Sequence, residues 1–481
     1  MLFYRNSSEF LRETTLSPLT FCDFLHILMI LPEITQRVVI VMKRFAMEKL
    51  RTWKDDPNRL PLIIGGARQV GKTWLMKEFG KIYFEKCAYI NFDRNKRMEQ
   101  LFSGDFNVDR ILTGLSIESN VDIEPENTLI ILDEIQEVPP ALQSLKYFCE
   151  DERHSYYIVA AGSLLGIAMH QGTSFPVGKV ESMELYPMSF TEFLEATGNT
   201  PLLDLLQKKD FDMVTTFKDK YIDLLKLYYY VGGMPAVVKS YVDNGNLQNV
   251  RRIQKRLVSD YEQDFSKHAP TAVIPRIQMV WDGLPSQLAK ENKKFIYSVL
   301  REGARAKDFE LAIQWLLDCG LCYKVGRVTK GGIPLKAYQD IPAFKLYLVD
   351  VGLLGAMTDL DAKTLLQGNV IFTEFKGALT EQYVCQQLYA EFDTTPYYWS
   401  AASSSGEVDF VLQHSGAVIP LEVKAEENLN AKSLKNFVNT YRLGYGVRTS
   451  MSDYREQEKL INLPLYAISQ LWEVCNDFPT P

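Results

Sequence analysis

The eight residues from Gly66 to Thr73 have the types and spacing of a phosphate-binding loop. They spell Gly-Ala-Arg-Gln-Val-Gly-Lys-Thr, which fits the pattern G-x-x-x-x-G-K-[ST]. The glycines let the backbone approach phosphate oxygens closely, Lys72 can reach the β and γ phosphates, and Thr73 can ligate Mg²⁺. The pattern therefore predicts ATP and Mg²⁺ as cofactors. The residues predicted to contact the nucleotide are Gly66, Ala67, Arg68, Gln69, Val70, Gly71, Lys72, Thr73 and Trp74.

Two adjacent acids supply the second half of such a site. The apolar run Leu129–Leu132 leads into Asp133 and Glu134, and Asp133 lies 61 residues after Lys72. Phosphoryl transfer needs charge neutralisation and a positioned nucleophile more than covalent chemistry. We therefore expect Asp133 to hold the Mg²⁺ shell and Glu134 to orient and deprotonate the attacking water. The alternative, a buried strand followed by a solvated acidic turn, is much the weaker because the loop precedes it.

A serine after a further apolar run is a candidate sensor of the γ-phosphate. The run Tyr157–Ala161 ends in Gly162 and Ser163. A serine after a strand is as often a helix N-cap, so both roles stay open for Ser163.

Near the C-terminus, acids and a lysine have the spacing of a metal-dependent hydrolytic site. Asp409 lies in Val408–Leu412, and Val418–Leu421 leads into Glu422-Val-Lys424, giving the pattern D-x₁₂-E-x-K. In a strand Glu422 and Lys424 share a face, so both can meet a metal-bound water while Asp409 supplies a second metal ligand. Glu381, in a helical segment, could add a third oxygen. The structural alternative is a hairpin with a cross-strand salt bridge.

Several of these segments together resemble a known family. Leu62–Thr73, Leu132-Asp-Glu-Ile-Gln136, Ala161-Gly-Ser163, Leu185–Leu194 and Gly232-Gly-Met-Pro235 look like a prokaryotic family of AAA-superfamily ATPases with an uncharacterised C-terminal domain, related to archaeal-type ATPases. The resemblance covers residue 42 to the end. It implies an AAA core, a winged helix and a nuclease-like tail. The segments around Glu407–Phe410 and Pro420–Lys424 resemble the PD-(D/E)XK nuclease superfamily.

The chain departs from the family pattern at one position. Gly178-Lys179 stands where the resemblance implies Gly-Arg. Lysine lacks the planar five-donor fork of arginine, which puts a finger role for this position in doubt. The arginines that could serve instead are Arg251, Arg252, Arg256 and Arg276.

The order of apolar and helical segments places these motifs in an α/β protein. We expect the fold class to be a P-loop NTPase (AAA-type) parallel sheet with a helical lid, a winged-helix-like segment and a C-terminal mixed α/β nuclease-like domain. Strands are expected at Leu62–Ile64, Ala88–Phe92, Leu129–Leu132 and Tyr156–Ala161. The predicted boundaries are 1–41 for an N-terminal extension, with translation starting at Met42, 42–200 for the ATPase core, 201–275 for the lid, 276–340 for the winged helix and 341–481 for the nuclease-like domain.

Length, charge and cysteine usage limit the class of protein. A chain of 481 residues is too long for one core, and its hydrophobic fraction of 46% is that of a globular protein. Seven cysteines are too sparse for a disulfide scaffold, which favours the cytoplasm. The apolar stretch Phe24–Pro32 is too short to cross a bilayer and is a poor export signal, so we expect no membrane partner.

The net charge of −7 gives no general attraction to nucleic acid, so any DNA-binding surface must be local. Within residues 286–330 a basic cluster could bind DNA, or could be a solvated helix face. Its members are Lys290, Lys293, Lys294, Arg301, Arg305, Lys307, Lys324, Arg327 and Lys330.

The leading hypothesis is an ATP hydrolase that couples Mg·ATP to a nuclease-like, DNA-binding C-terminal half, with homo-oligomerisation left open. The main alternative is a nucleotide-dependent switch or scaffold whose degenerate nuclease fold binds a partner. A small-molecule kinase is disfavoured because Asp133-Glu134 matches a water-activating pair.

Overall fold

A computed structural model describes the fold of most of the chain. The described residues are 43–153, 155–162, 165–166, 175–290, 293–367, 373–392, 394–401, 406–427 and 430–477. The predictions for residues 1–41 and for Ser163 lie outside them. Residues from Met42 onward pack as one unit. None of the described helices is both long and apolar enough to cross a bilayer.

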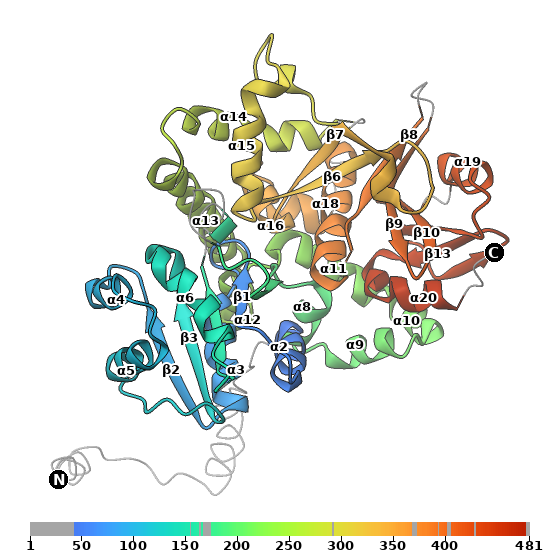
Figure 1. Cartoon of the computed structure of the whole chain (residues 1–481). Helices are drawn as coiled ribbons and strands as arrows, with labels where there is room; N and C mark the ends of the chain where they lie inside the picture. The colour runs from blue at the N-terminus through green and yellow to red at the C-terminus, as the bar shows by residue number, and fades with distance from the viewer. Residues whose placement is uncertain are drawn as a thin grey trace, which may run out of the picture. The chain divides into compact units, whose positions relative to one another are not determined.

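The N-terminal part of this unit is built on a five-stranded parallel sheet, coloured blue to green in Figure 1. Its strand order is β2-β3-β4-β1-β5. The bounds are Leu62–Gly65 for β1, Lys86–Asn91 for β2, Thr128–Asp133 for β3, Tyr157–Ala161 for β4 and Glu181–Glu184 for β5. The four predicted strands and their parallel direction are confirmed. Strand β5 was not predicted, because three of its four residues, in the sequence Glu-Ser-Met-Glu, are polar.

Helices cover both faces of this sheet, so its central strands are apolar throughout. Ile64 and Ile131 face α3 (Lys72–Tyr83), whereas Ile63 and Leu132 face the opposite layer. That opposite layer contains α5 and α6, and α4 packs beside them. The bounds of the flanking helices are Ala46–Asp55 for α2, Lys96–Phe102 for α4, Val108–Ser119 for α5 and Pro139–Cys149 for α6.

The segment predicted to be a lid is helical. Its helices are α9 (Thr200–Gln207), α10 (Phe211–Thr216), α11 (Lys218–Val231), α12 (Pro235–Asn244) and α13 (Leu247–His268), and α8 (Phe190–Ala196) precedes them within the predicted ATPase core. The predicted break at Gly232-Gly-Met-Pro235 separates α11 from α12. Gly232 has a φ of 74°, which favours glycine, and Pro235 starts α12.

The C-terminal part contains an eight-stranded mixed sheet of order β12-β13-β11-β10-β9-β8-β6-β7, coloured yellow to red in Figure 1. Its strands are β6 (Cys322–Val328), β7 (Gln339–Leu348), β8 (Tyr397–Ser400), β9 (Glu407–His414), β10 (Ala417–Val423), β11 (Gly446–Ser450), β12 (Arg455–Gln457) and β13 (Leu460–Pro464). The mixed α/β character expected for this part is confirmed.

The winged-helix segment does not stand apart from this sheet. Its helices α14 (Ile274–Leu288) and α15 (Ala306–Asp318) lead into the antiparallel pair β6 and β7, in the predicted order. However, β6 also pairs with β8, so the hairpin belongs to the larger sheet. The boundary predicted at residue 340 falls inside β7, and a separate winged helix is not confirmed.

Helices also cover the C-terminal sheet. The bounds of the remaining helices are Val351–Met357 for α16, Ala362–Gln367 for α17, Thr373–Glu391 for α18, Lys432–Thr440 for α19 and Leu471–Asn476 for α20. Leu379 of α18 packs in one core with Phe410, whereas Phe437 of α19 packs in another with Val411. Successive residues of β9 therefore point to opposite faces of the sheet, and each face is covered by a different helix.

A buried polar network joins α18 to the ATPase part. Gln387 accepts a hydrogen bond from the Phe190 backbone N–H at 2.7 Å. Gln386 donates to Asp350 at 3.1 Å, and Asp350 accepts from the Gly233 N–H at 2.6 Å. Gly233 has no room for a side chain, since a Cβ there would lie 2.1 Å from the carbonyl oxygen of Met188. Buried hydrogen bonds thus join the two parts. Separating the parts without exposing these groups to water would leave them unpaired, which costs free energy.

Glu391, at the end of α18, makes this junction sensitive to pH. Burial raises its pKa to about 7, while Thr191 donates a hydrogen bond to its carboxylate. Between pH 4.5 and 7 the folded protein keeps a proton that the unfolded chain has released, so this group costs stability as pH rises. We expect Glu391→Gln to match the wild type near pH 4.5 and to exceed its free energy of unfolding at pH 8 by up to about 3 kcal/mol. Urea unfolding at both pH values measures this, and an equal difference at both would contradict it.

Candidate functional site

The phosphate-binding loop connects β1 directly to α3. Gly66 and Gly71 have φ values of 120° and 98°, which other residues rarely adopt. A Cβ at Gly66 would lie 2.2 Å from the Leu185 carbonyl oxygen. Gly71 is the N-cap of α3, and the cap makes no side-chain hydrogen bond, so the first N–H groups of the helix are directed to the loop. The loop therefore has the backbone form that an anion at a helix N-terminus needs.

Lys72 is held in the loop by its own backbone. Its Nζ donates to the carbonyl oxygens of Gly66 at 2.7 Å and Ala67 at 2.9 Å. The side chain is buried, and this burial lowers the pKa of Lys72 to about 8 despite the nearby carboxylates of Glu134 and Glu184. An arriving phosphate would raise this pKa again, because an opposite charge favours the protonated form.

The predicted magnesium residues lie together at the adjoining strand end. Thr73 donates from its hydroxyl to Asp133 Oδ2 at 2.8 Å, and Asp133 ends β3. Tyr89 of β2 donates to the same oxygen at 2.9 Å. A hydroxyl and a carboxylate at one point are the oxygen ligands that Mg²⁺ takes, so these residues fit that ion. Tyr89 was missed, since an isolated tyrosine in a strand carries no sequence signal for this contact.

Glu134 follows Asp133 directly, and its backbone conformation is no longer that of a strand. Its φ is 55°, in the left-handed region, and Gln136 donates to its carboxylate at 2.7 Å. The Gln136 amide lies against Gly162 at the end of β4, where a Cβ would come within 1.9 Å of the amide oxygen. Strands β3 and β4 thus position Glu134 through Gln136, beside the loop that carries Lys72.

Side chains from outside the motif hold the remaining loop residues. Arg68 forms an ion pair with Asp264 of α13, and Tyr261 of that helix donates to the Arg68 carbonyl oxygen at 2.8 Å. Gln69 donates to Asp260 of the same helix at 3.1 Å. Helix α13 therefore supports the loop from beyond the predicted ATPase core.

On another side of the loop lies Arg44, which also was not predicted. It donates to the Val70 carbonyl oxygen at 2.9 Å and to that of Tyr186 at 2.6 Å. It also pairs with Glu192 at 3.1 Å. Trp74, predicted to contact the nucleotide, is exposed on α3.

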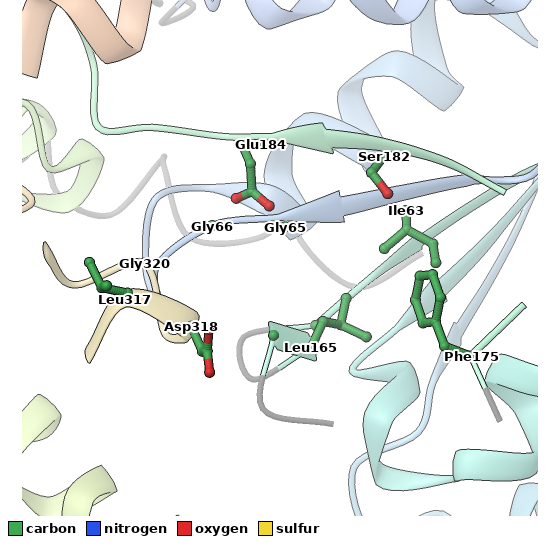
Figure 2. Close-up of a pocket in the computed structure, with 12 residues that line it drawn as sticks. Ile63, Gly65, Gly66, Leu165, Phe175, Ser182, Glu184, Leu317, Asp318 and Gly320 are labelled. Atoms are coloured by element: carbon green, nitrogen blue, oxygen red, sulfur yellow. The ribbon is translucent and has the colours of Figure 1, made fainter. Parts of the chain in front are cut away.

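A cavity of about 250 Å³ opens beside the loop (Figure 2). Glu184 of β5 points into it next to Gly65 and Gly66, and Asp318 and Gly320 line it from the end of α15. Burial raises the pKa of Glu184. Glu184 was not predicted as a site residue, because β5, which carries it, was itself not predicted.

The candidate finger residues differ in their surroundings. Arg251 is committed to structure: it donates to the Leu360 carbonyl oxygen at 2.7 Å and lies over the Tyr230 ring. Arg252, Arg256 and Arg276 are exposed. Lys179 pairs with Glu150 at 3.0 Å. A finger role for any of these residues stays a prediction.

In the C-terminal part, Glu381 is surrounded by lysines. Its two carboxylate oxygens lie 2.6 Å from Lys293 Nζ and 3.8 Å from Lys345 Nζ. Tyr347 also donates to it, at 3.2 Å. Lys345 is fully buried and pairs with Glu407 at 2.5 Å.

The other three predicted residues also have partners. Asp409 accepts from the Val423 N–H at 2.8 Å, and Lys424 pairs with Glu422 at 2.6 Å. Glu422 and Lys424 share a face as predicted. Among the described residues, no group of three or more His, Cys, Asp and Glu side chains is arranged to hold a metal ion. The metal site at Asp409, Glu422 and Glu381 stays a prediction, and these contacts count against it.

The predicted basic surface is only partly available. Lys293 is buried with Glu381, and Arg327 pairs with Asp340 at 3.0 Å. Lys324 and Lys330 lie over aromatic rings. Five of the predicted members are exposed, namely Lys294, Arg301, Arg305, Lys307 and Lys330.

Three protein-family models match separate parts of the chain. Residues 58–194 match an AAA domain, residues 222–364 match a domain of unknown function (DUF8612), and residues 376–468 match another (DUF4143). The first match spans the loop, Asp133 and Glu134. This part of the chain therefore matches an AAA domain, and its parallel sheet has the fold of P-loop NTPases.

The chain is also similar to several solved structures. The chain is similar to a Walker-type ATPase of Pyrococcus abyssi, with 14% identity over 66% of this chain and 96% of that chain and a TM-score of 0.41. It is also similar to the ORC1 protein of Aeropyrum pernix in complex with DNA (12% identity, 66% and 90% covered, TM-score 0.27). A third is the ORC2 protein of that organism in its ADP form, with 13% identity over 69% of this chain and 93% of that chain and a TM-score of 0.27. A comparison with curated proteins finds no match.

Proposed function

We propose that this protein binds ATP with Mg²⁺ and hydrolyses it at the loop between β1 and α3. The observation that carries the proposal is the contact between the Thr73 hydroxyl and Asp133 at 2.8 Å, beside buried Lys72 at the N-terminus of α3. Strands distant in sequence bring together a phosphate-binding backbone, a cation and oxygen ligands for a divalent ion. The alternative, a strand followed by a solvated acidic turn, does not explain the hydrogen bond between Thr73 and Asp133.

Each residue then has a defined task. The N–H groups of the loop and Lys72 hold the β and γ phosphates. Thr73 and Asp133 would hold Mg²⁺, which supplies charge neutralisation on the phosphate oxygens when bound. Glu134, oriented by Gln136, accepts the proton of the attacking water. Tyr89 fixes the Asp133 carboxylate as a positioning residue.

The nucleotide site and the C-terminal part are connected through α13. Near one end this helix holds Arg68 and Gln69 of the loop. Near the other, Arg251 donates to the Gly352 carbonyl oxygen at 3.2 Å, and Lys255 pairs with Asp359. Occupancy of the loop by phosphate competes with Asp264 for Arg68, so nucleotide binding has a route to the C-terminal half.

For that half we favour partner binding over cleavage of nucleic acid. The specific observation is that Lys293, which is not part of the motif, pairs with Glu381, an acid that a metal-dependent nuclease would need free. DNA contact through the exposed cations around α15, and assembly into a homo-oligomer, stay open.

A test of the proposal is phosphate release by the full chain. We expect turnover with Mg²⁺ that stops when EDTA removes the ion, because the phosphate charge is then no longer neutralised. Single-stranded DNA, duplex DNA and RNA are added in separate reactions. Stimulation by one of them identifies a polymer-driven motor, whereas tight nucleotide retention with no stimulation identifies a switch. Turnover that persists in EDTA would contradict the assigned site.

A further inference from the structure

Lys345 is a positive charge inside the C-terminal sheet. It projects from β7, where its side chain is fully buried and its ammonium lies 5.0 Å from the centre of the Tyr398 ring on β8. From there it reaches Glu407 on β9. An ammonium taken so far from water is tolerated only when carboxylates compensate it.

Three carboxylates act on this ammonium. Glu407 lies 2.5 Å away and Glu381 lies 3.8 Å away. Burial alone would lower the pKa of Lys345, but Glu381, Glu407 and Asp409 together raise it above its usual value. The acids come from α18 and β9, so one cation links elements that are separated in sequence.

The same three carboxylates would otherwise repel one another. Burial and the nearby Glu381 raise the pKa of Asp409. Lys293 supplies a second ammonium, 2.6 Å from Glu381. The cluster thus holds three acids against two lysines, which leaves one excess negative charge at most.

We propose that the Lys345 ammonium does for Glu381, Glu407 and Asp409 what a divalent cation does in a metal-dependent site, while these acids themselves are not arranged to hold a metal ion. The lysine supplies the charge balance and the cross-link between α18 and β9 that a metal ion would supply. The cluster is therefore structural and works without a metal. This inference deepens the partner-binding role proposed for the C-terminal half, and it is independent of ATP hydrolysis.

The test is thermal unfolding of the full chain without nucleotide, with Mn²⁺ or with EDTA. All proteins carry Asp133→Asn, so that the ATP site does not contribute a metal response. With Lys345 present we expect equal melting temperatures in Mn²⁺ and EDTA. Lys345→Met should lower the melting temperature in EDTA by several degrees. Mn²⁺ should then recover part of that loss, because three acids face one remaining lysine.

Matched variants separate the outcomes. Lys345→Arg keeps the charge and should show no Mn²⁺ response, and adding Asp409→Asn to Lys345→Met should erase the response. A Mn²⁺ shift in the protein with Lys345 that Asp409→Asn abolishes would overturn the proposal, and so would the lack of any shift in Lys345→Met. If Lys345→Met does not fold, the protein with Lys345 decides alone. Asp409→Asn there should raise the melting temperature equally in Mn²⁺ and EDTA, whereas a metal-dependent change refutes the inference. Failure of ATP turnover affects none of these results.

Discussion

Replacing Glu134 with glutamine is expected to reduce ATP turnover by about 10²–10⁴-fold while leaving ATP affinity within a few-fold of the wild type. The amide keeps the size of the side chain and can still contact Gln136, but it cannot accept the proton of the attacking water. Because Glu134 lies beyond the loop that holds the phosphates, the ground-state complex loses little. Single-turnover phosphate release and nucleotide titration measure the two quantities separately.

Glu137→Gln is the matched control. Glu137 is exposed on the following turn, and its substitution removes the same charge from the same segment. Its turnover should stay near that of the wild type. Equal turnover in the Glu134 variant and the wild type would refute the assignment of the general base. A large loss of affinity would instead assign Glu134 to binding.

Replacing Lys72 with alanine is expected to weaken ATP binding by about 10- to 150-fold, which corresponds to the roughly 1.5–3 kcal/mol of a hydrogen bond to a charged group. The variant removes the buried cation that faces the β and γ phosphates. It also leaves the carbonyl oxygens of Gly66 and Ala67 without the donor they have now. Calorimetric titration with a slowly hydrolysed ATP analogue measures the change.

Lys81→Ala controls for loss of a lysine from α3, since Lys81 is exposed in the last turn of that helix. It should bind ATP as the wild type does. The Glu134 variant should therefore lose ATP turnover, whereas the Lys72 variant should lose ATP affinity. Unchanged affinity in Lys72→Ala would mean that the nucleotide binds elsewhere.

The geometry of the phosphate loop and of Asp133 was predictable because its sequence signals are local. A phosphate loop needs glycines, a lysine and a hydroxyl within eight residues, and Asp133 stands directly at the end of an apolar strand. The contacts that position these groups are not local. Tyr89, Arg44 and Asp264 reach the site from other elements, and nothing in their own sequence neighbourhoods reveals it.

For the predicted C-terminal site, the residues that decide its properties are distant in sequence. Its acids could be found by spacing, but their charge state depends on Lys345, which lies 64 residues before Asp409 in the chain. The same is true of the winged-helix prediction. The order of two helices and a hairpin was right, yet only the pairing of β6 with β8 shows that the hairpin belongs to a larger sheet.

The 22 residues of α13 have a thermodynamic consequence. A helix of that length spans about 33 Å. Near one end it forms an ion pair with the phosphate loop, and near the other it donates a hydrogen bond to α16. If a ligand of the C-terminal half displaces this helix and thereby changes the affinity for ATP by some factor, ATP must change the affinity for that ligand by the same factor. An unidentified partner can therefore be sought through the nucleotide: its binding is expected to differ between the ATP-bound and the empty protein.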